Sequence, residues 1–200
     1  MRQRDKAIIN DLNRFRVMSR DDLIDLHFRK LKRPVTACNT VMKRLRRDGH
    51  VKAVTNYGQY IYMPYDSKIK ADSTKIPHFL RIVGFYRDVC KHERPKIFTV
   101  EPKYGAKGTV EPDIFMIWKG SPFFVEIQRT QYTQKVMDAK LDRYEAFYHG
   151  GEWKKERWQP KGKAYFPHVW IITDTQYKIS NRPFQIMQSA TVDELFAAVS

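Results

Sequence analysis

Two acidic side chains stand at the outer ends of two apolar runs in the stretch EPDIFMIWKGSPFFVEIQR, Glu111 to Arg129. The segment Lys119 to Pro122 separates the runs, and its Gly and Pro predict a hairpin of two antiparallel strands. If the turn is centred on its first two residues, Asp113 falls opposite Glu126. A register slipped by two residues would place Asp113 opposite Gln128 instead.

The pairing of Asp113 with Glu126 indicates a cation site. Residues directly opposite each other in a ladder lie about 5 Å apart on one face, and two carboxylates in so small a space raise one of their pKa values. A divalent metal would remove that cost. In the alternative, Asp113 only follows Pro112 in a turn, and Glu126 forms an ion pair with Arg129 or Lys140 at a sheet edge.

The elements that must position these side chains follow from the pattern between residue 68 and residue 174. The polar run KIKADSTK is typical of a linker, and the apolar face from Phe79 to Val89 predicts a helix. Runs 96–101, 113–118 and 123–128 predict strands, 131–149 a second helix and 168–174 a buried strand. A strand after the second helix indicates a crossover, and hence a mixed sheet with helices packed on it.

The first third of the chain predicts three short helices and a hairpin. Apolar residues recur at helical spacing from residue 2 to 15, and Ser19 is a good N-cap for a second helix. Pro34 begins a third helix, which Gly49 ends. Two β-type runs around residues 56–58 then predict a hairpin, and this order, over residues 2–65, resembles a winged helix-turn-helix.

Charge points to nucleic acid as the partner. The 200 residues carry a net charge of +15, and residues 1–65 hold 15 basic and 6 acidic side chains. Such an excess of Lys and Arg is typical of a DNA-binding domain. An amphipathic basic helix or an apolar run of about 18 residues, which would indicate a membrane partner, is absent from the sequence.

Other classes of site find little support. Cys38 and Cys90 are the two cysteines and have no C-x-x-C partner, and the six histidines lack ligand spacing, so a zinc site or disulfide framework is not expected. A Gly-rich phosphate loop, which would indicate ATP use, is also missing. The N-terminus has no apolar core of a secretory signal, so a cytoplasmic location is expected.

Two segments are candidate DNA contacts. The third helix should enter the major groove with an exposed polar face, whose residues are Thr36, Asn39, Thr40, Lys43, Arg44 and Arg47; the alternative is an ordinary solvated face. In the insertion 150–166, the cations Lys154, Lys155 and Arg157 alternate with tryptophans. That alternation suits stacked bases and tracked phosphates, and equally a loop held to the body by its aromatic side chains.

The order αβββαβ, with Pro112-Asp113 opening the second strand and Glu126-Ile127-Gln128 closing the third, resembles the PD-(D/E)XK superfamily of nucleases. A winged helix before such a core, with Glu101, Lys140 and Tyr144 at the expected places, looks like the replication-relaxation family of plasmids and phages. The resemblance implies an α+β chain with a winged helix-turn-helix at 1–66, a linker at 67–75 and an αβββαβ PD-(D/E)XK-like mixed-sheet domain at 76–200.

The resemblance also implies roles. Asp113, Glu126 and the upstream acid Glu101 would hold Mg2+ through hard oxygen ligands, with Glu93 a weaker choice for the upstream acid. A metal-bound water would attack phosphorus. The family's lysine is Gln128 here, which offers a hydrogen bond but no positive charge.

Lys140 on the following helix could supply the missing charge, with Lys135 as a less favoured choice. The expected catalytic set is therefore Asp113, Glu126, Gln128 and Lys140.

The leading hypothesis is a DNA-binding protein of a mobile element that acts in replication or its control, with a Mg-dependent phosphodiesterase domain. The alternative is a transcription regulator whose nuclease-like domain is inactive and serves dimerisation or partner binding. An RNA-binding or structural accessory protein is a third class. A homodimer is the expected assembly, because winged helices often bind as pairs.

Overall fold

The computed structural model describes residues 1–55, 58–105, 108–128 and 130–197. The chain forms two compact units, Met1–Arg87 and Asp88–Ser200, whereas the sequence predicted a second domain that begins at residue 76. The difference arises because most of the helix after the linker packs within the first unit. The ring of Tyr86 lies 5.0 Å from that of Phe15.

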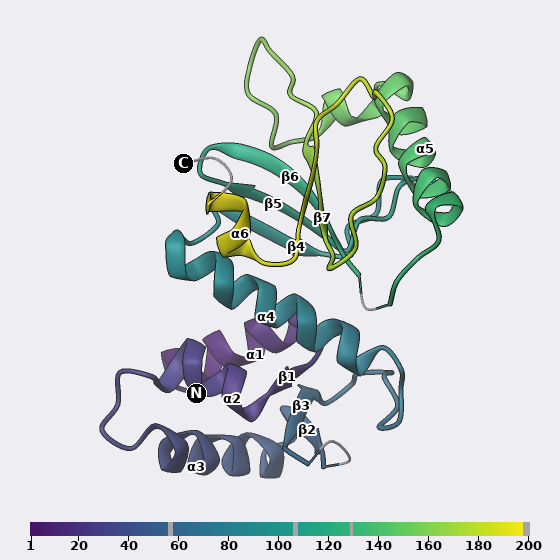
Figure 1. Ribbon diagram of the computed structural model, residues 1–200. Helices are drawn as coiled ribbons and strands as arrows, with labels where there is room; N and C mark the ends of the chain where they lie inside the picture. The colour runs from purple at the N-terminus through teal and green to yellow at the C-terminus, as the bar shows by residue number, and fades with distance from the viewer. Residues whose placement is uncertain (56–57, 106–107, 129, 198–200) are drawn as a thin grey trace. The chain divides into compact units, whose positions relative to one another are not determined.

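The first unit contains three helical segments, a small antiparallel sheet and most of a fourth helix; the first three helical segments and the hairpin follow the predicted order. Its sheet has the strand order β1-β3-β2, and Ile8, Leu12, Phe15, Met42 and Leu45 are fully buried in its core. The elements are α1 (Gln3–Phe15), β1 (Met18–Ser19), α2 (Arg20–Leu23), the π-helical η1 (Ile24–Phe28), α3 (Pro34–Arg47), β2 (Val51–Val54), β3 (Ile61–Pro64) and most of α4 (Ile76–His92) (Figure 1).

Local sequence explains where these helices begin and end. The Ser19 side chain accepts a hydrogen bond from the Asp22 backbone N–H, as an N-cap should. Pro34 occupies the first turn of α3, and Gly49 follows its end with a φ of 72°, which favours glycine. The predicted centre of the hairpin, residues 56 and 57, lies outside the described residues.

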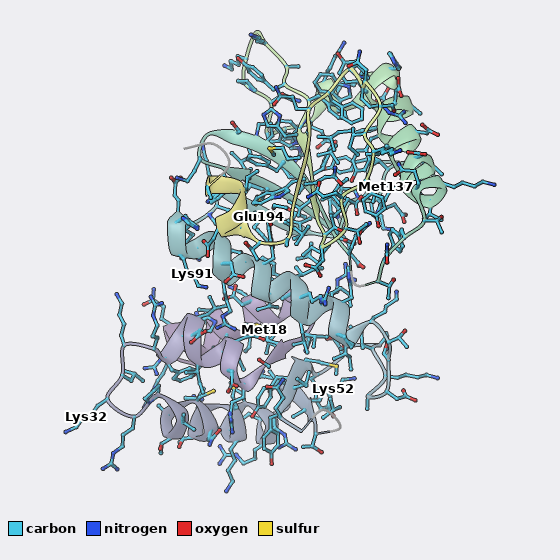
Figure 2. All side chains as sticks on the ribbon, in the orientation of Figure 1. Met18, Lys32, Lys52, Lys91, Met137 and Glu194 are labelled. Atoms are coloured by element: carbon cyan, nitrogen blue, oxygen red, sulfur yellow. The ribbon has the colours of Figure 1, made fainter. Side chains whose placement is uncertain are left out.

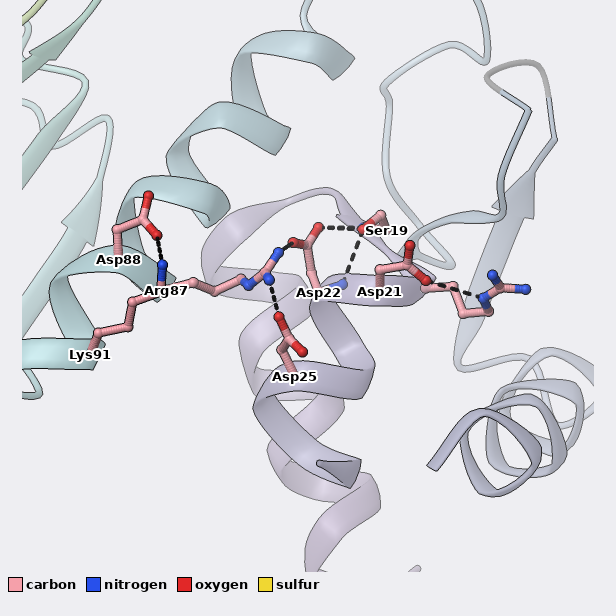
Figure 3. Close-up of polar contacts among 8 residues, drawn as sticks. Ser19, Asp21, Asp22, Asp25, Arg87, Asp88 and Lys91 are labelled. Carbon is pink, nitrogen blue, oxygen red and sulfur yellow. Dashed lines mark hydrogen bonds and ion pairs between the residues drawn. The ribbon is translucent and has the colours of Figure 1, made fainter. Parts of the chain in front are cut away.

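A polar network ties α4 to α2 and η1 within the first unit (Figure 3). The Arg87 guanidinium donates to Asp22 Oδ1 at 2.9 Å and also to the Asp25 carboxylate. The other oxygen of Asp22 accepts from the Ser19 backbone N–H at 2.9 Å and from its hydroxyl at 2.6 Å. One arginine on α4 therefore compensates two acidic side chains, Asp22 in α2 and Asp25 in η1.

The second unit is built on a mixed five-stranded sheet, as the crossover predicted. Strand order is β4-β5-β6-β7-β8; the first three strands are antiparallel, and β7 pairs in parallel with both β6 and β8. The elements are β4 (Ile97–Val100), β5 (Ile114–Trp118), β6 (Ser121–Ile127), α5 (Gln134–Gly150), the 3-10 helix η2 (Glu152–Lys155), β7 (His168–Ile172), β8 (Ile186–Ser189) and α6 (Val192–Ala197). The fold class is α+β, and β8 and α6 were not predicted.

Figure 1 shows α5 along one face of this sheet. Phe115 and Phe124 point to that face and pack with Met137, Leu141 and Tyr144 of α5 in one buried cluster. Because side chains alternate along a strand, Asp113 and Glu126 lie on the same face as Phe115 and Phe124. Within the described residues, no helix has the length and apolar content needed to span a bilayer.

Candidate functional site

The β5–β6 hairpin sets the register of the acidic pair. Lys119 and Gly120 form its turn with φ values of 49° and 79°, the positive angles that a two-residue hairpin turn requires. The ladder runs from Trp118 opposite Ser121 to Ile114 opposite Val125. One further step places Asp113 opposite Glu126, which is the first of the two registers considered from the sequence.

Three acidic residues form a row across neighbouring strands. The Glu101 backbone N–H donates to the Asp113 carbonyl at 2.8 Å, and Asp113 Oδ2 accepts from the Ile127 backbone N–H at 2.7 Å. Glu101 follows β4, Asp113 precedes β5 and Glu126 lies in β6. The structure therefore brings the three predicted acids to one end of the sheet.

Glu93 lies at the opposite end of the sheet. Its carbonyl accepts the Trp118 indole N–H at 2.7 Å, and Trp118 is five residues along β5 from Asp113, about 17 Å at the usual rise of a strand. Glu93 is thus excluded as the upstream acid of this site.

Two side chains of α5 bind both oxygens of Glu126. The Lys140 ammonium donates to Oε2 at 2.5 Å, and the Tyr144 hydroxyl donates to Oε1 at 2.6 Å. Glu126 is 2% exposed and Lys140 is 20% exposed, so the pair is largely withdrawn from water. The predicted alternative of an ion pair between Glu126 and Lys140 is confirmed, but the pair is not at a sheet edge, because β6 is the central strand. Arg129 lies outside the described residues, and Lys135 is exposed.

Burial dominates the electrostatics of this site. Burial raises the pKa of Glu126 to about 7; Lys140 opposes the rise and the charge of Asp113 adds to it. Burial lowers the pKa of Lys140, but the negative charges of Glu126 and Asp113 outweigh it, so that pKa lies above its ordinary value. Burial, and next the charge of Glu126, hold the pKa of Tyr144 well above its usual range.

Gln128 is buried on the same face, two residues beyond Glu126. The Tyr177 hydroxyl donates to Gln128 Oε1 at 3.0 Å and accepts a hydrogen bond from the Tyr132 backbone N–H at 3.0 Å. The backbone N–H of Gln128 donates to the Ile172 carbonyl at 3.0 Å. Tyr177 was missed from the sequence because it lies far along the chain, in a loop without a periodic pattern.

The carboxylates of Asp113 and Glu126 are the hard oxygen ligands that Mg2+ prefers. Both Glu126 oxygens, however, already accept hydrogen bonds from α5, and the Lys140 ammonium contacts one of them directly. Among the described residues, no three His, Cys, Asp or Glu side chains gather closely enough to hold a metal ion. The residues therefore fit a magnesium ion only if Lys140 first withdraws from Glu126.

The predicted DNA-contact face of α3 is exposed except at one position. Cys38, Met42 and Leu45 turn inward, and the opposite side presents Thr36, Asn39, Thr40, Lys43 and Arg47. Arg44 departs from the prediction. It is 35% exposed, and its guanidinium donates to Asp5 Oδ2 at 2.9 Å, where Asp5 is 1% exposed.

Replacing Arg44 with alanine should therefore lower the stability of the first unit by about 1–3 kcal/mol, because Asp5 would lose a charged hydrogen-bond donor. Burial raises the pKa of Asp5, but Arg44 and the Arg2 backbone N–H together bring it below its ordinary value of 3.8. The stability that these two hydrogen bonds contribute is present above pH 3.8 and is lost as pH falls through the folded pKa of Asp5. The loss of stability in Arg44→Ala should therefore become smaller in acid. Urea denaturation followed by far-UV circular dichroism measures this loss.

Lys43→Ala is the matched control for Arg44→Ala, since Lys43 is exposed one position earlier in the same helix. A loss of stability equal to that of Arg44→Ala would show that the Asp5 contact contributes nothing.

A basic turn lies directly before α3 and was not among the predicted DNA contacts. Four of the five residues in the run RKLKR, Arg29 to Arg33, are cationic, and all five are exposed. Figure 2 shows Lys32 extending away from the ribbon at this turn. The charge run was visible in the sequence, but it fell between two predicted helices and was assigned to neither.

The tryptophans of the insertion after α5 hold it against the rest of the second unit. Trp153 is 5% exposed and donates to the Tyr148 carbonyl at 2.9 Å, and the ring of Trp158 lies 4.9 Å from that of Phe115. Of the two roles left open from the sequence, these contacts favour the structural one for both tryptophans. The predicted contacts Lys154, Lys155 and Arg157 are exposed.

Residues 64–160 match the model of a protein family described as Replication-relaxation. The matched segment begins at the last residue of β3 and includes Asp113, Glu126 and Lys140, but not α1 to α3. Neither the curated proteins nor the solved structures contain a significant match to this chain.

Proposed function

We propose that this chain, of which residues 64–160 match the Replication-relaxation family model, binds duplex DNA and acts in replication or its control on a plasmid or phage. The family match supports the connection with replication. In this proposal the first unit is a winged helix-turn-helix that chooses the DNA site, with α3 as the recognition helix and the β2–β3 hairpin as the wing.

The exposed polar face of α3 is the observation that carries the proposal. A recognition helix reads bases with side chains that donate and accept hydrogen bonds, and Asn and Thr suit base edges while Lys and Arg suit guanine or phosphate. Asn39, Thr40 and Lys43 are exposed on one side of a helix whose other side is buried. The basic turn Arg29–Arg33 leads into the same helix and would contact the backbone of the duplex.

Lys43→Ala and Arg47→Ala should each weaken duplex binding and each reduce the slope of log K against log salt by about one, if each residue contacts a phosphate. Fluorescence anisotropy of a labelled duplex at several salt concentrations measures both quantities. Arg47 has a surface ion pair with Asp48, with 74% of its side chain exposed, so its loss should leave stability almost unchanged. Unaltered slopes in both variants would refute α3 as the recognition helix.

As a second candidate function, we propose that the second unit is a PD-(D/E)XK-like phosphodiesterase that uses Mg2+. The observation that favours it is the placement of Asp113 opposite Glu126 with Glu101 beside them. Asp113 and Glu126 would hold the ion, which on binding would activate water and neutralise charge on the phosphate. Lys140 would release Glu126 and bind the phosphodiester instead.

In a plasmid-nicking assay with Mg2+ or Mn2+, the wild type should nick and Asp113→Asn and Glu126→Gln should not. Lys135→Met, on the exposed side of α5, is the control that should nick like the wild type. Equal products from the wild type and both carboxylate variants would remove the catalytic proposal.

Absence of any metal-dependent product would favour the alternative, a transcription regulator with an inactive core. Two observations support that alternative. Both oxygens of Glu126 already accept hydrogen bonds from α5, and Gln128 accepts one from Tyr177. A homodimer, to which the inactive core would contribute, stays a prediction.

A further inference from the structure

A cavity of about 350 Å3 opens at the β4 edge of the sheet, a volume at the lower end of those of ligand sites in proteins. Its residues come from β4 and the following loop, from β5 and from the insertion after α5. The ones that decide its chemistry are Thr99, Tyr104, Phe115, Glu156, Arg157 and Trp158.

The inner surface of this cavity is aromatic. Phe115 is 3% exposed, and the ring of Trp158 lies 4.9 Å from it with an interplanar angle of 37°. Tyr104 is half-buried, and its ring lies 5.3 Å from that of Phe124. Partly buried aromatic side chains of this kind offer a planar ligand ring a stacking surface.

Polar groups at the cavity differ in charge. Arg157 and Thr99 are exposed and Glu156 is half-buried. Glu156 and Tyr104 both line the cavity; burial raises the pKa of Tyr104, and the charge of Glu156 adds to that rise. An aromatic ligand with an N–H donor for Glu156 and an attached phosphate for Arg157 would match these groups, and a nucleotide has both.

The cavity lies beside the acidic row. Thr99 pairs with Phe115 in the β4–β5 ladder, and the next outward pair on the same face joins Glu101 to Asp113. Two residues along a strand correspond to about 7 Å. A strand of nucleic acid with one base in the cavity would therefore bring its backbone close to Asp113 and Lys140.

We propose that this cavity binds one unstacked base of single-stranded DNA, with Tyr104 and Trp158 providing the stacking surface and Arg157 contacting the adjoining phosphate. The inference rests on the proposed DNA-binding function and extends it, since it gives the second unit a single-stranded substrate distinct from the duplex bound by α3.

Thr99→Trp tests the inference, because it fills the cavity from an exposed position and removes no side chain of the core. Anisotropy with a labelled oligonucleotide, single-stranded or annealed to its complement, should show about tenfold weaker single-strand binding. Duplex binding should be unchanged. Arg157→Ala should weaken single-strand binding more than Lys161→Ala, which removes an equal charge from an exposed position outside the cavity.

Three outcomes separate the proposals. Wild-type levels of single-strand binding by Thr99→Trp would overturn the cavity inference and leave the duplex function standing. Failure of the wild type to bind either DNA would remove the proposed function and this inference with it. If Thr99→Trp does not fold, photocrosslinking of the wild type to a strand with 5-iodouracil decides: crosslinks at Tyr104 or Trp158 support the site, and crosslinks confined to other residues overturn it.

Discussion

Replacing Lys140 with methionine is expected to lower the free energy of unfolding of the second unit by about 3 kcal/mol in neutral to alkaline buffer. The reason is that Glu126, 2% exposed, would lose the cation that contacts it, and a buried charge left without its partner is strongly destabilising. All four tryptophans lie between residues 118 and 170, so tryptophan fluorescence during urea denaturation reports this unit alone.

The effect of Lys140→Met should depend on pH in a defined direction. The folded pKa of Glu126, about 7, lies above its ordinary value of 4.5, so the folded chain binds the extra proton and stability falls as pH rises from 4.5 to about 7. Without Lys140 the pKa of Glu126 rises further, because Lys140 opposes that rise. The loss of folding stability then continues to higher pH. Below pH 4.5 Glu126 is protonated in the folded and the unfolded chain, and its ionisation no longer changes the stability.

Two controls accompany this prediction. Lys135→Met removes an exposed lysine from the same helix and should change stability by less than about 0.5 kcal/mol. Adding Glu126→Gln to Lys140→Met should restore much of the loss, because the buried charge is then gone. A deficit of the same size at acid and alkaline pH would show that methionine disturbs packing and that the ion pair is not the cause.

Neutralising three cations of the basic turn, with Lys30, Lys32 and Arg33 changed to alanine, is expected to weaken duplex binding by about a hundredfold at about 0.1 M salt. For each phosphate contact that is lost, DNA binding releases one counterion fewer. The slope of log K against log salt should therefore fall by about three. The three side chains are exposed, and the folded state should not lose stability beyond about 0.5 kcal/mol.

Lys68, Lys70 and Lys75 form the matched control for the basic turn. They belong to the same unit, are equally exposed and carry the same total charge. If removing these three lysines weakens binding as much as the change at the basic turn, net charge alone drives the association and the turn has no special role.

The pairing of Asp113 with Glu126 was predictable from the sequence because it depends on local structure, whereas Glu101 was expected only from the family resemblance. Lys119-Gly120 fixes the hairpin turn, the turn fixes the register, and the register places Asp113 opposite Glu126. Ser19, Pro34 and Gly49 likewise mark helix ends through their own backbone preferences, which the structure retains.

Features that depend on distant partners could not be predicted in the same way. Arg44 carries the helical spacing of a DNA contact, but Asp5 lies 39 residues earlier and holds it. Gln128 contacts Tyr177, 49 residues later. For Glu126 the sequence left Arg129 and Lys140 open as partners, and the structure shows the contact with Lys140.

β8 escaped prediction for a different reason. It is a four-residue strand in parallel pairing at the sheet edge, and so short a run leaves too few positions for a period to appear.

Lysine footprinting tests the central claim, duplex binding by α3 and its basic turn, most directly. The protein is acetylated with and without a saturating DNA duplex, and the modified lysines are quantified by mass spectrometry. The proposal predicts that the duplex protects Lys30, Lys32 and Lys43 while Lys68, Lys70 and Lys75 stay reactive. Equal reactivity of the first three with and without DNA, in a sample that binds the duplex, would contradict it.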